Sequence, residues 1–406
     1  SMIDVANPDK DGNVVFEDVP AGKFYIKEVN SLNGYELNET EYEVESSYVK
    51  DLDEDIVEDL DEPIVNKPNS STTVLVKVDE HTGEKLPGVQ FKLWKVYSDG
   101  SKELVMNDGA DVWITDENGE IHVPGLDDGN YEWEEVETLP GYIDEGTKIQ
   151  ISVGEDSNVE VTVGNHPSEM SFIKIDAETG KPVHGAKMAL LHENGDPVKV
   201  NDSGYVVHDP EAAATHGDAN WISGDHPHVI RGLEVGKTYQ LVELEAPEGY
   251  AQAKPVVFTV DNVVGLQLSS MNNKFTDVRV IKRDWSSGEP VHGATLEIRE
   301  VDKDGIVGDI AVDKVTGKPV VWTTGPGLED GFIIRGLKVG QLYEVVETQV
   351  PEGYLPQSED ITMRFTVLDT EDIQTIVVVN EPIPNVGTKA AYIDGSKENL
   401  PEDNLV

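Results

Sequence analysis

The amino-acid sequence predicts an all-β fold, a tandem array of antiparallel, Ig-like β-sandwiches. Short segments rich in Val, Ile, Tyr and Thr alternate with turn signals, helical periodicity is almost absent, and one strand-like segment occurs four times. The copies start roughly 105 residues apart, which is the length of an independent domain rather than of a solenoid repeat. Because the connectors between the copies are short, we expect the array to be elongated. The copies start at Phe24, Tyr131, Tyr239 and Tyr343.

Composition limits the classes of partner. The 406 residues include 79 acidic and 31 basic side chains, a net charge of −48, and no Cys. This charge argues against nucleic acid and anionic membranes, since phosphate binding needs clusters of Lys and Arg. No apolar run approaches the roughly 18 residues of a membrane span. We therefore expect a monomeric segment with no membrane insertion, no disulfide and no cofactor.

Each copy of the recurring segment reads aromatic-x-x-x-Glu and reaches a Gly-Tyr seven residues after the Glu. Side chains alternate across a strand, so the Glu shares a face with the aromatic residue and with the apolar residue between them. The pattern therefore directs a carboxyl group toward the apolar side of each domain. The four residues are Glu28, Glu135, Glu243 and Glu347.

The segments can be taken in order along the chain. Residues 1–67 match only the C-terminal part of a unit, so we expect a truncated domain there, followed by complete units at 72–167, 168–275 and 276–384. Each complete unit opens on an alternating strand that ends in Lys-x-Asp, followed by a Gly-rich turn and a second short strand. Residues 385–406 do not restart this pattern, and we expect a further truncated repeat or a disordered tail.

The same alternation places one Lys of each opening strand and one Asn of each closing strand on the apolar face. In the third unit two Asn residues compete: Met271 favours Asn273, whereas Leu266 and Leu268 share a face with Asn272. The pairs are Lys77 with Asn165, Lys174 with Asn273, and Lys282 with Asn380.

These residue types suggest a reaction. A buried Lys avoids the cost of a desolvated charge by losing its proton, and the free amine is a nucleophile. A buried Glu that holds a proton could polarise the Asn carboxamide and then pass the proton to the leaving ammonia. The product is an amide bond between the two side chains. The alternative is a buried, hydrogen-bonded ion pair with no bond formed; recurrence in three units favours the crosslink.

The motifs resemble a known family. Lys-x-Asp with a Gly-rich turn, Tyr-x-x-x-Glu…Pro-x-Gly-Tyr (the "E-box" of Gram-positive pilins) and a terminal Val-x-Asn resemble Cna B-type (SpaA-like, prealbumin-like) domains over about residues 1–384. The resemblance implies Lys–Asn isopeptide bonds promoted by a catalytic Glu. It implies Glu135 for Lys77–Asn165, Glu243 for Lys174–Asn273 and Glu347 for Lys282–Asn380. In the truncated first domain it leaves Glu28 and Asn66 without a Lys.

Such domains are stalk modules of Gram-positive adhesins and pilins. The resemblance therefore implies an extracellular stalk segment of a cell-wall-anchored adhesin, whose partners are neighbouring domains of the same surface protein, and no turnover of an external substrate. One alternative is a module that binds a host matrix protein or glycan through the loops 192–228 and 302–330. Trp113, Trp221 and Trp322 would be its contacts. Another is a pilin subunit polymerised by a sortase, although no pilin-type Tyr-Pro-Lys motif is present.

Two weaker signals remain. The tail from Gly387 is similar to the opening strand of VaFE-type repeats, which implies Thr388 as the Thr of an ester bond, while a disordered polar tail explains it equally well. The calcium-loop-like stretch at Asp9 lacks a terminal Glu, and His226-Pro-His228 fits a solvated loop. We therefore expect no metal site.

Overall fold

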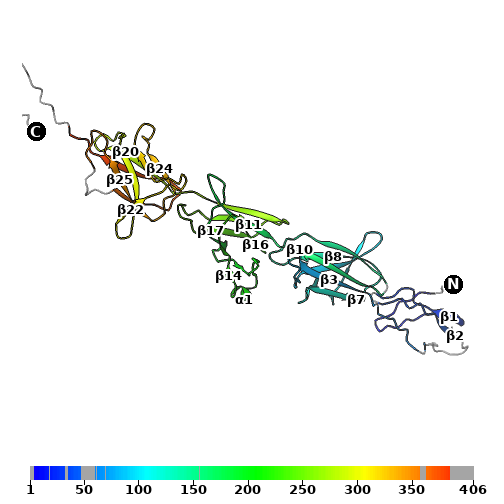
Figure 1. Ribbon diagram of the computed structural model, residues 1–406. Coiled ribbons are helices and arrows are strands. Elements are labelled where there is room, and N and C mark those ends of the chain that lie inside the picture. The colour runs from blue at the N-terminus through cyan, green and yellow to red at the C-terminus, as the bar shows by residue number, and fades with distance from the viewer. Residues whose placement is uncertain are drawn as a thin grey trace, which may run out of the picture. The chain divides into compact units, whose positions relative to one another are not determined.

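The computed structural model describes residues 4–17, 19–32, 35–46, 60, 62–68, 70–154, 156–356 and 363–384. Regular structure in these ranges is almost entirely β-strand, with one short helix, α1 (Pro210–Ala213) (Figure 1). The all-β prediction is confirmed. The chain divides into two compact units, one made of Ser1–Pro167 with Asn262–Val264 and the other of Ser168–Asp261 with Gly265–Val406. Thr388 and the other residues after position 384 lie outside the described ranges.

The first unit holds a small two-stranded sheet and one complete sandwich. In the small sheet, β1 (Gly22–Ile26) pairs antiparallel with β2 (Tyr42–Ser46). The sandwich has one sheet in the order β10-β3-β7 and a second in the order β5-β4-β8-β9, with β6 beside β4. Its strands are β3 (Thr72–Asp79), β4 (Gln90–Val96), β5 (Lys102–Val105), β6 (Trp113–Ile114), β7 (Glu120–Pro124), β8 (Gly129–Glu137), β9 (Lys148–Val153) and β10 (Asn158–Asn165).

The second unit holds two sandwiches of the same design. The sheets of the first are β16-β11-β19 and β15-β12-β17-β18, with a small β13-β14 ribbon in its long loop. Its strands are β11 (Glu169–Asp176), β12 (Lys187–His192), β13 (Lys199–Val200), β14 (Gly217–Asp218), β15 (Asn220–Ile222), β16 (His228–Arg231), β17 (Thr238–Glu245), β18 (Val256–Thr259) and β19 (Leu266–Asn273).

The other sandwich has the sheets β24-β20-β27 and β22-β21-β25-β26, with β23 beside β21. Its strands are β20 (Asp277–Asp284), β21 (Thr295–Val301), β22 (Val307–Ile310), β23 (Val321–Thr323), β24 (Phe332–Arg335), β25 (Leu342–Gln349), β26 (Met363–Thr366) and β27 (Gln374–Asn380). We refer to residues 72–165, 169–273 and 277–380 as the second, third and fourth domains, and to residues 4–68 as the first.

The first and last strands of each complete sandwich lie side by side and parallel: β3 with β10, β11 with β19, and β20 with β27. The prediction of antiparallel sandwiches holds for the other ladders but is wrong for this pair. Parallel neighbours cannot be joined by a tight turn, and here the whole sandwich forms the connection. The two strands where the chain enters and leaves the domain are therefore direct neighbours.

Alternating burial gives each sandwich its own core. Along β20, for example, every second residue from Val278 is buried, and Lys282 and Asp284 occupy the last two buried positions. In the second domain the core includes Leu75 and Trp133, both fully buried. The inward Lys thus follows the buried apolar residues of its strand and precedes a buried Asp, on the face that strand alternation predicts.

In the three complete domains the recurring segment forms a central strand with a β-bulge directly after its Glu. In β8, Glu135 lies opposite Phe91 and Glu137 opposite Gln90, so Val136 has no counterpart on β4. The same irregularity leaves Leu244 of β17 and Thr348 of β25 unpaired with the neighbouring strand. A bulge bends the strand and changes the direction of the side chains beside it. In these domains the bulge ends the regular alternation of buried and exposed side chains directly after the Glu.

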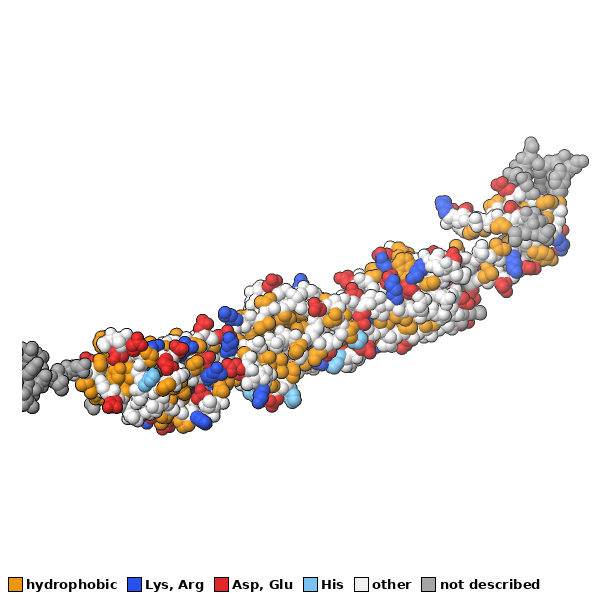
Figure 2. All heavy atoms as spheres, turned by 90° about the horizontal axis from the view of Figure 1, so that it is seen from above, with side chains coloured by type: hydrophobic (Ala, Val, Ile, Leu, Met, Phe, Trp, Pro, Cys, Tyr) orange, Lys and Arg blue, Asp and Glu red, His pale blue; other side chains and the backbone are white. Residues whose placement is uncertain are grey.

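Acidic side chains are distributed over the face of the molecule that Figure 2 shows, where they are scattered among hydrophobic and polar ones. No helix in the part of the chain that the structure describes has the length and apolar character of a membrane span. The same residues contain no group of three or more His, Asp or Glu side chains placed to hold a metal ion.

Candidate functional site: three buried Lys–Glu–Asn clusters

In the second domain, β3, β8 and β10 bring Lys77, Glu135 and Asn165 together. Lys77 Nζ lies 3.1 Å from Glu135 Oε2 and also contacts Asn165 Oδ1. Asn165 Nδ2 donates to Glu135 Oε1 and to Thr138 Oγ1, both at 2.7 Å. Lys77 is fully buried, with its ammonium 5.7 Å from the centre of the Phe91 ring. The amide oxygen thus faces the amine, and the amide nitrogen faces the carboxyl group.

The third domain repeats the cluster on β11, β17 and β19. Lys174 Nζ lies 3.1 Å from Glu243 Oε1, to which Asn273 Nδ2 donates at 2.9 Å. The other carboxyl oxygen accepts the backbone N–H of Ala253 at 2.7 Å. Asn273 is fully buried, whereas Asn272 points to the exposed side of β19. Of the two candidates, the structure brings Asn273 to the Lys and Glu.

The fourth domain repeats it on β20, β25 and β27. Lys282 Nζ lies 3.1 Å from Glu347 Oε1, and Asn380 Nδ2 donates to Glu347 Oε2 at 3.1 Å. The second N–H of this amide donates to the carbonyl of Leu355, also at 3.1 Å. In both the third and the fourth domain, the Asn Oδ1 is buried without a hydrogen-bond partner among the described residues, while the Lys Nζ has its Glu at 3.1 Å. The amide oxygen is thus left unsatisfied in these two clusters.

Burial is the main influence on the three amines. It lowers the pKa of Lys77, Lys174 and Lys282 below the ordinary value of a Lys, and the neighbouring Glu opposes this shift only in part. A lowered pKa increases the fraction of neutral amine, which is the nucleophilic form. Burial beside apolar residues thus favours the neutral form of each Lys.

In the first domain, Glu28 and Asn66 also lie together. Asn66 Nδ2 donates to Glu28 Oε1 at 2.7 Å, and Glu28 Oε2 accepts the backbone N–H of Asn38 at 2.7 Å. Both side chains are half-buried rather than buried. The Glu–Asn half of the cluster is thus assembled by residues 28–66 alone.

The three Trp residues considered as ligand contacts pack against the domain cores. Trp113 donates from Nε1 to the carbonyl of Val105, Trp221 stacks on His228 with ring centres 4.4 Å apart, and Trp322 is buried. Each belongs to the apolar cluster of its domain. In the structure they therefore contribute to the packing of the domain cores.

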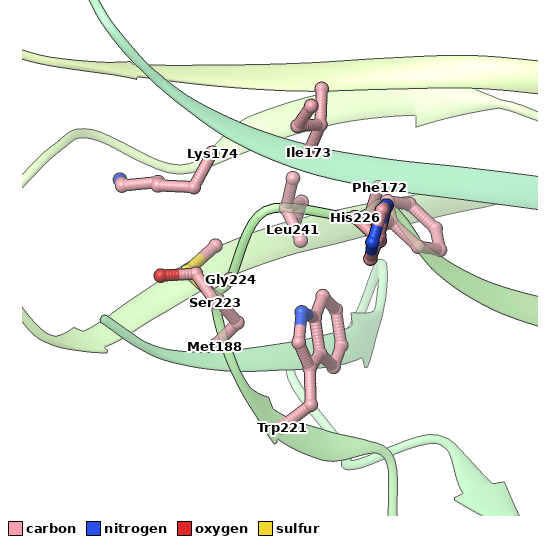
Figure 3. Close-up of a pocket in the computed structure, with 9 residues that line it drawn as sticks. All are labelled: Phe172, Ile173, Lys174, Met188, Trp221, Ser223, Gly224, His226 and Leu241. Atoms are coloured by element: carbon pink, nitrogen blue, oxygen red, sulfur yellow. The ribbon is translucent and has the colours of Figure 1, made fainter. Parts of the chain in front are cut away.

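A small hollow borders the third cluster, and Figure 3 shows the Lys174 side chain extending away from Trp221 and His226, which also line it. The space open to the centre of a water-sized sphere is about 10 Å³, close to what a single water molecule needs. The hollow is therefore too small for a sugar or a peptide side chain.

Sequence reasoning missed the groups that orient the amides and the carboxyl groups. Thr138, the backbone N–H of Ala253 and the carbonyl of Leu355 each bind one cluster, and they come from different positions after the Glu. The residues that align with Thr138 in the other two domains are Ala246 and Val350. Among the three complete domains only the second has a polar residue at this position, so the comparison of the repeats gave no signal.

Comparison with solved structures finds distant similarity. The Bacillus anthracis TIE protein is 17% identical over 85% of this chain, with a TM-score of 0.39, and the chain spans 55% of its length. The major pilin subunit BcpA of Bacillus cereus is 16% identical, with 77% of this chain and 99% of that one covered and a TM-score of 0.32. The major pilin SpaD of Corynebacterium diphtheriae is 16% identical, with 77% and 97% covered and a TM-score of 0.34. No curated protein matches the chain.

One family description matches nearly the whole chain. The SpaA prealbumin-like fold domain matches residues 2–56, 71–167, 168–274 and 276–382. The last three matches each include one complete Lys–Glu–Asn cluster. Domains of this kind are structural modules rather than enzymes. The chain therefore belongs to the SpaA family of prealbumin-like domains, which it contains in four successive copies.

Proposed function

We propose that each of the three clusters forms a Lys–Asn isopeptide bond in a single reaction that the domain performs on itself. The observation that carries the proposal is the recurrence of the geometry. In three separate sandwiches, a buried amine, a carboxyl group and a carboxamide meet, with Lys–Glu distances of 3.1 Å in each. A structural ion pair has no need of an amide carbon beside the amine, whereas a transamidation requires it.

The reaction can be written with balanced atoms. The neutral Lys amine attacks the Asn side-chain carbonyl carbon, a new carbon–nitrogen bond forms, and the carbon–nitrogen bond to Nδ2 breaks. The proton lost by the Lys nitrogen passes through the Glu carboxyl group to the departing nitrogen, which leaves as ammonia. In each domain the Glu is within hydrogen-bond distance of Asn Nδ2, between 2.7 and 3.1 Å. The Glu is regenerated, but each domain reacts only once.

The position of the bond suggests a mechanical purpose. Lys77 lies near the end of β3, where the chain enters the second domain, and Asn165 ends β10, where it leaves. Tension along the chain would cross from one strand to the other through the new bond, so the residues between 77 and 165 would bear no load. The bond would also restrict the unfolded chain much as a disulfide does, in a chain without Cys.

We therefore propose that the chain is a stalk segment of a Gram-positive cell-wall-anchored surface protein, which holds other domains of that protein away from the cell. The second candidate is a pilin subunit polymerised by a sortase, which the four E-box segments favour. It would give ladders of covalent multimers on cells, and the stalk would not. A host-ligand module has less support, because the Trp residues that would make contact pack inward.

The intact mass of the denatured chain tests the reaction. The mass should be lower than that of the sequence by three ammonias. The Glu135→Ala, Glu243→Ala and Glu347→Ala variants should each restore one. Peptide mapping should then locate the bonds at Lys77–Asn165, Lys174–Asn273 and Lys282–Asn380. A chain with the full sequence mass would leave the clusters as buried polar networks and refute the proposal.

A further inference from the structure

Each complete domain also contains a Tyr–Asp pair that the reaction itself does not use. We propose that this pair is a positioning device, which holds the strand that carries the Asn in register with the strand that carries the Lys. The inference rests on the proposed crosslink and adds the residues that set its geometry. The Tyr ends the recurring segment and the Asp ends Lys-x-Asp. The pairs are Tyr142 with Asp79, Tyr250 with Asp176, and Tyr354 with Asp284.

The two oxygens of the Asp carboxylate have separate tasks. In the second domain, Asp79 Oδ1 accepts the backbone N–H groups of His81 and Thr82, at 2.8 and 2.7 Å, and so fixes the turn after β3. Its Oδ2 accepts the hydroxyl of Tyr142 at 2.9 Å. Asp79 is only 2% exposed, so both sets of contacts replace lost hydration.

The third domain repeats this division, and the fourth repeats the turn contact and pairs Tyr354 with the same Asp. Asp176 Oδ1 accepts from the turn residue Thr179 at 2.7 Å, and its Oδ2 accepts the Tyr250 hydroxyl at 3.1 Å. Asp284 Oδ1 accepts the backbone N–H of Ser287 at 2.7 Å. Burial and the hydrogen bond with Asp284 raise the pKa of Tyr354. The arrangement is therefore a property of the repeat and not of one domain.

The backbone around the Tyr holds the Asn strand. Tyr142 forms a β-bridge with Pro167, and the N–H of Ile143 donates to the carbonyl of His166, the residue after Asn165, at 2.9 Å. The equivalent bond in the third domain runs from Ala251 to Lys274 at 3.0 Å. In the fourth domain it runs from Leu355 to Glu381 at 2.8 Å. The segment around the Tyr is thus bound by its backbone to the strand that carries the Asn, and by the Tyr hydroxyl to the strand that carries the Lys.

The parallel register shows why such an attachment matters. Asp79 lies directly opposite Asn165, and Lys77 lies opposite Val163, so the Lys side chain must reach diagonally along the strands to the amide. A slip of one residue would turn Asn165 to the other face of the sheet. Even a displacement of about 1 Å can slow a reaction between positioned groups by roughly 100-fold. The pair therefore acts through position, while the Glu acts on the reacting atoms.

Among its described residues, the first domain has the backbone bridge of the Tyr but not the Tyr–Asp pair. Tyr35 forms the same backbone bridge, to Pro68, and the N–H of Glu36 donates to the carbonyl of Lys67 at 2.8 Å. Residues 1–67 contain no Lys-x-Asp motif, and Tyr35 is 40% exposed. The backbone bridge at Tyr35 therefore forms in a domain whose described residues include no Asp placed to accept the Tyr hydroxyl. Removing only the hydroxyl from Tyr142 should leave the fold in place.

The test is a time course of crosslinking in the full chain. The chain is synthesised in a cell-free system, samples are quenched in denaturant, and the crosslinked peptides are quantified by mass spectrometry. With Tyr142→Phe, the Lys77–Asn165 bond should form roughly 10- to 100-fold more slowly. The bonds at Lys174 and Lys282 in the same molecules should form at the parental rate and serve as internal standards.

Three further variants separate position from general stability. Asp79→Ala should slow the same bond, and adding Tyr142→Phe to it should have little further effect. Asp79→Asn keeps an oxygen for the turn and an N–H for the Tyr oxygen, so it should restore most of the rate. Tyr131→Phe is the matched control, because it removes a buried hydroxyl that donates to the carbonyl of Asp127 at 2.9 Å, at the other end of β8.

The outcomes distinguish the two proposals. A parental rate at Lys77–Asn165 in Tyr142→Phe would overturn the positioning role, and so would an equal slowing by Tyr131→Phe. In either case the crosslink itself would stand. Absence of all three bonds from the parent chain would instead overturn the proposed function and the positioning role with it.

Discussion

Replacing Glu135 by Gln should remove the bond between Lys77 and Asn165 while keeping the shape of the cluster. The Gln oxygen can still accept from Asn165 Nδ2, but the amide cannot carry a proton from the Lys nitrogen to the leaving group. Lys77 and Asn165 are separated by 88 positions. A crosslink that closes a loop of this length lowers the entropy of the unfolded chain by an amount worth about 4.6 kcal/mol at 25 °C.

This free energy is large for one domain. A loss of about 4.6 kcal/mol corresponds to a fall of roughly 20–35 °C in the midpoint of thermal unfolding of a domain of this size. Differential scanning calorimetry of the full chain measures it, and the transitions of the third and fourth domains, whose clusters are intact, should stay unchanged. The variant's mass, higher by nearly one ammonia, shows that the bond is missing. If the bond is missing and the transition of the second domain does not fall, the argument from the entropy of the unfolded chain is wrong.

Three other predictions follow from the clusters. In the Asn380→Ala variant, Lys282 stays unlinked, and burial keeps its pKa in the folded state below the ordinary value of 10.5. Between these two values the unfolded state binds more protons than the folded state. The fourth domain should therefore become more stable as the pH rises through this range. Urea titration at several pH values checks this, and Lys282→Met in the same background should abolish the rise. Thr138→Val removes the second acceptor of Asn165 Nδ2 and should slow that bond by about fivefold, the worth of about one hydrogen bond, in the same time-course assay; an unchanged rate would show that the Glu alone orients the amide. Gly119→Ala places a Cβ 2.8 and 2.9 Å from backbone atoms, at φ +70°, and should destabilise the second domain by roughly 1–3 kcal/mol in calorimetry; a change below about 0.5 kcal/mol would contradict it.

The cluster residues could be predicted because the alternation of apolar and polar residues along a strand shows which side chains share the buried face. Lys282 follows Val278 and Val280 at every second position, and the structure buries all three. The choice between Asn272 and Asn273 was harder. Leu266 and Leu268 suggested the wrong face, because they lie exposed on β19, which is an edge strand. An apolar residue indicates the buried face only where a neighbouring layer covers it.

The bulge and the parallel pairing could not be predicted from alternation. The bulge at Val136 adds a residue to β8 opposite β4, and only the partner strand makes it visible. The parallel pairing of β3 with β10 joins residues nearly a domain apart, so no local pattern specifies it. Both features bear on the site: the bulge lies beside the carboxyl group, and the pairing brings the Asn beside the Lys strand. The sequence identifies the residues of the cluster, and the long-range pairing of the strands brings them together.

The unreacted cluster also carries a cost. In the third and fourth domains the Asn Oδ1 is buried without a hydrogen-bond partner in the part of the chain that the structure describes, and an unpartnered buried acceptor lowers the stability of the folded state by about 1–3 kcal/mol. The Lys Nζ is buried as well, with its Glu 3.1 Å away. The proposed bond would remove the buried ionisable amine, because the amine and the carboxamide would become one neutral amide and ammonia would leave. The reacting groups meet only when the first and last strands of a domain pair, which requires the rest of the sandwich to be in place between them. The proposed bond would therefore form after folding, and it would stabilise the folded state whose geometry the reaction requires.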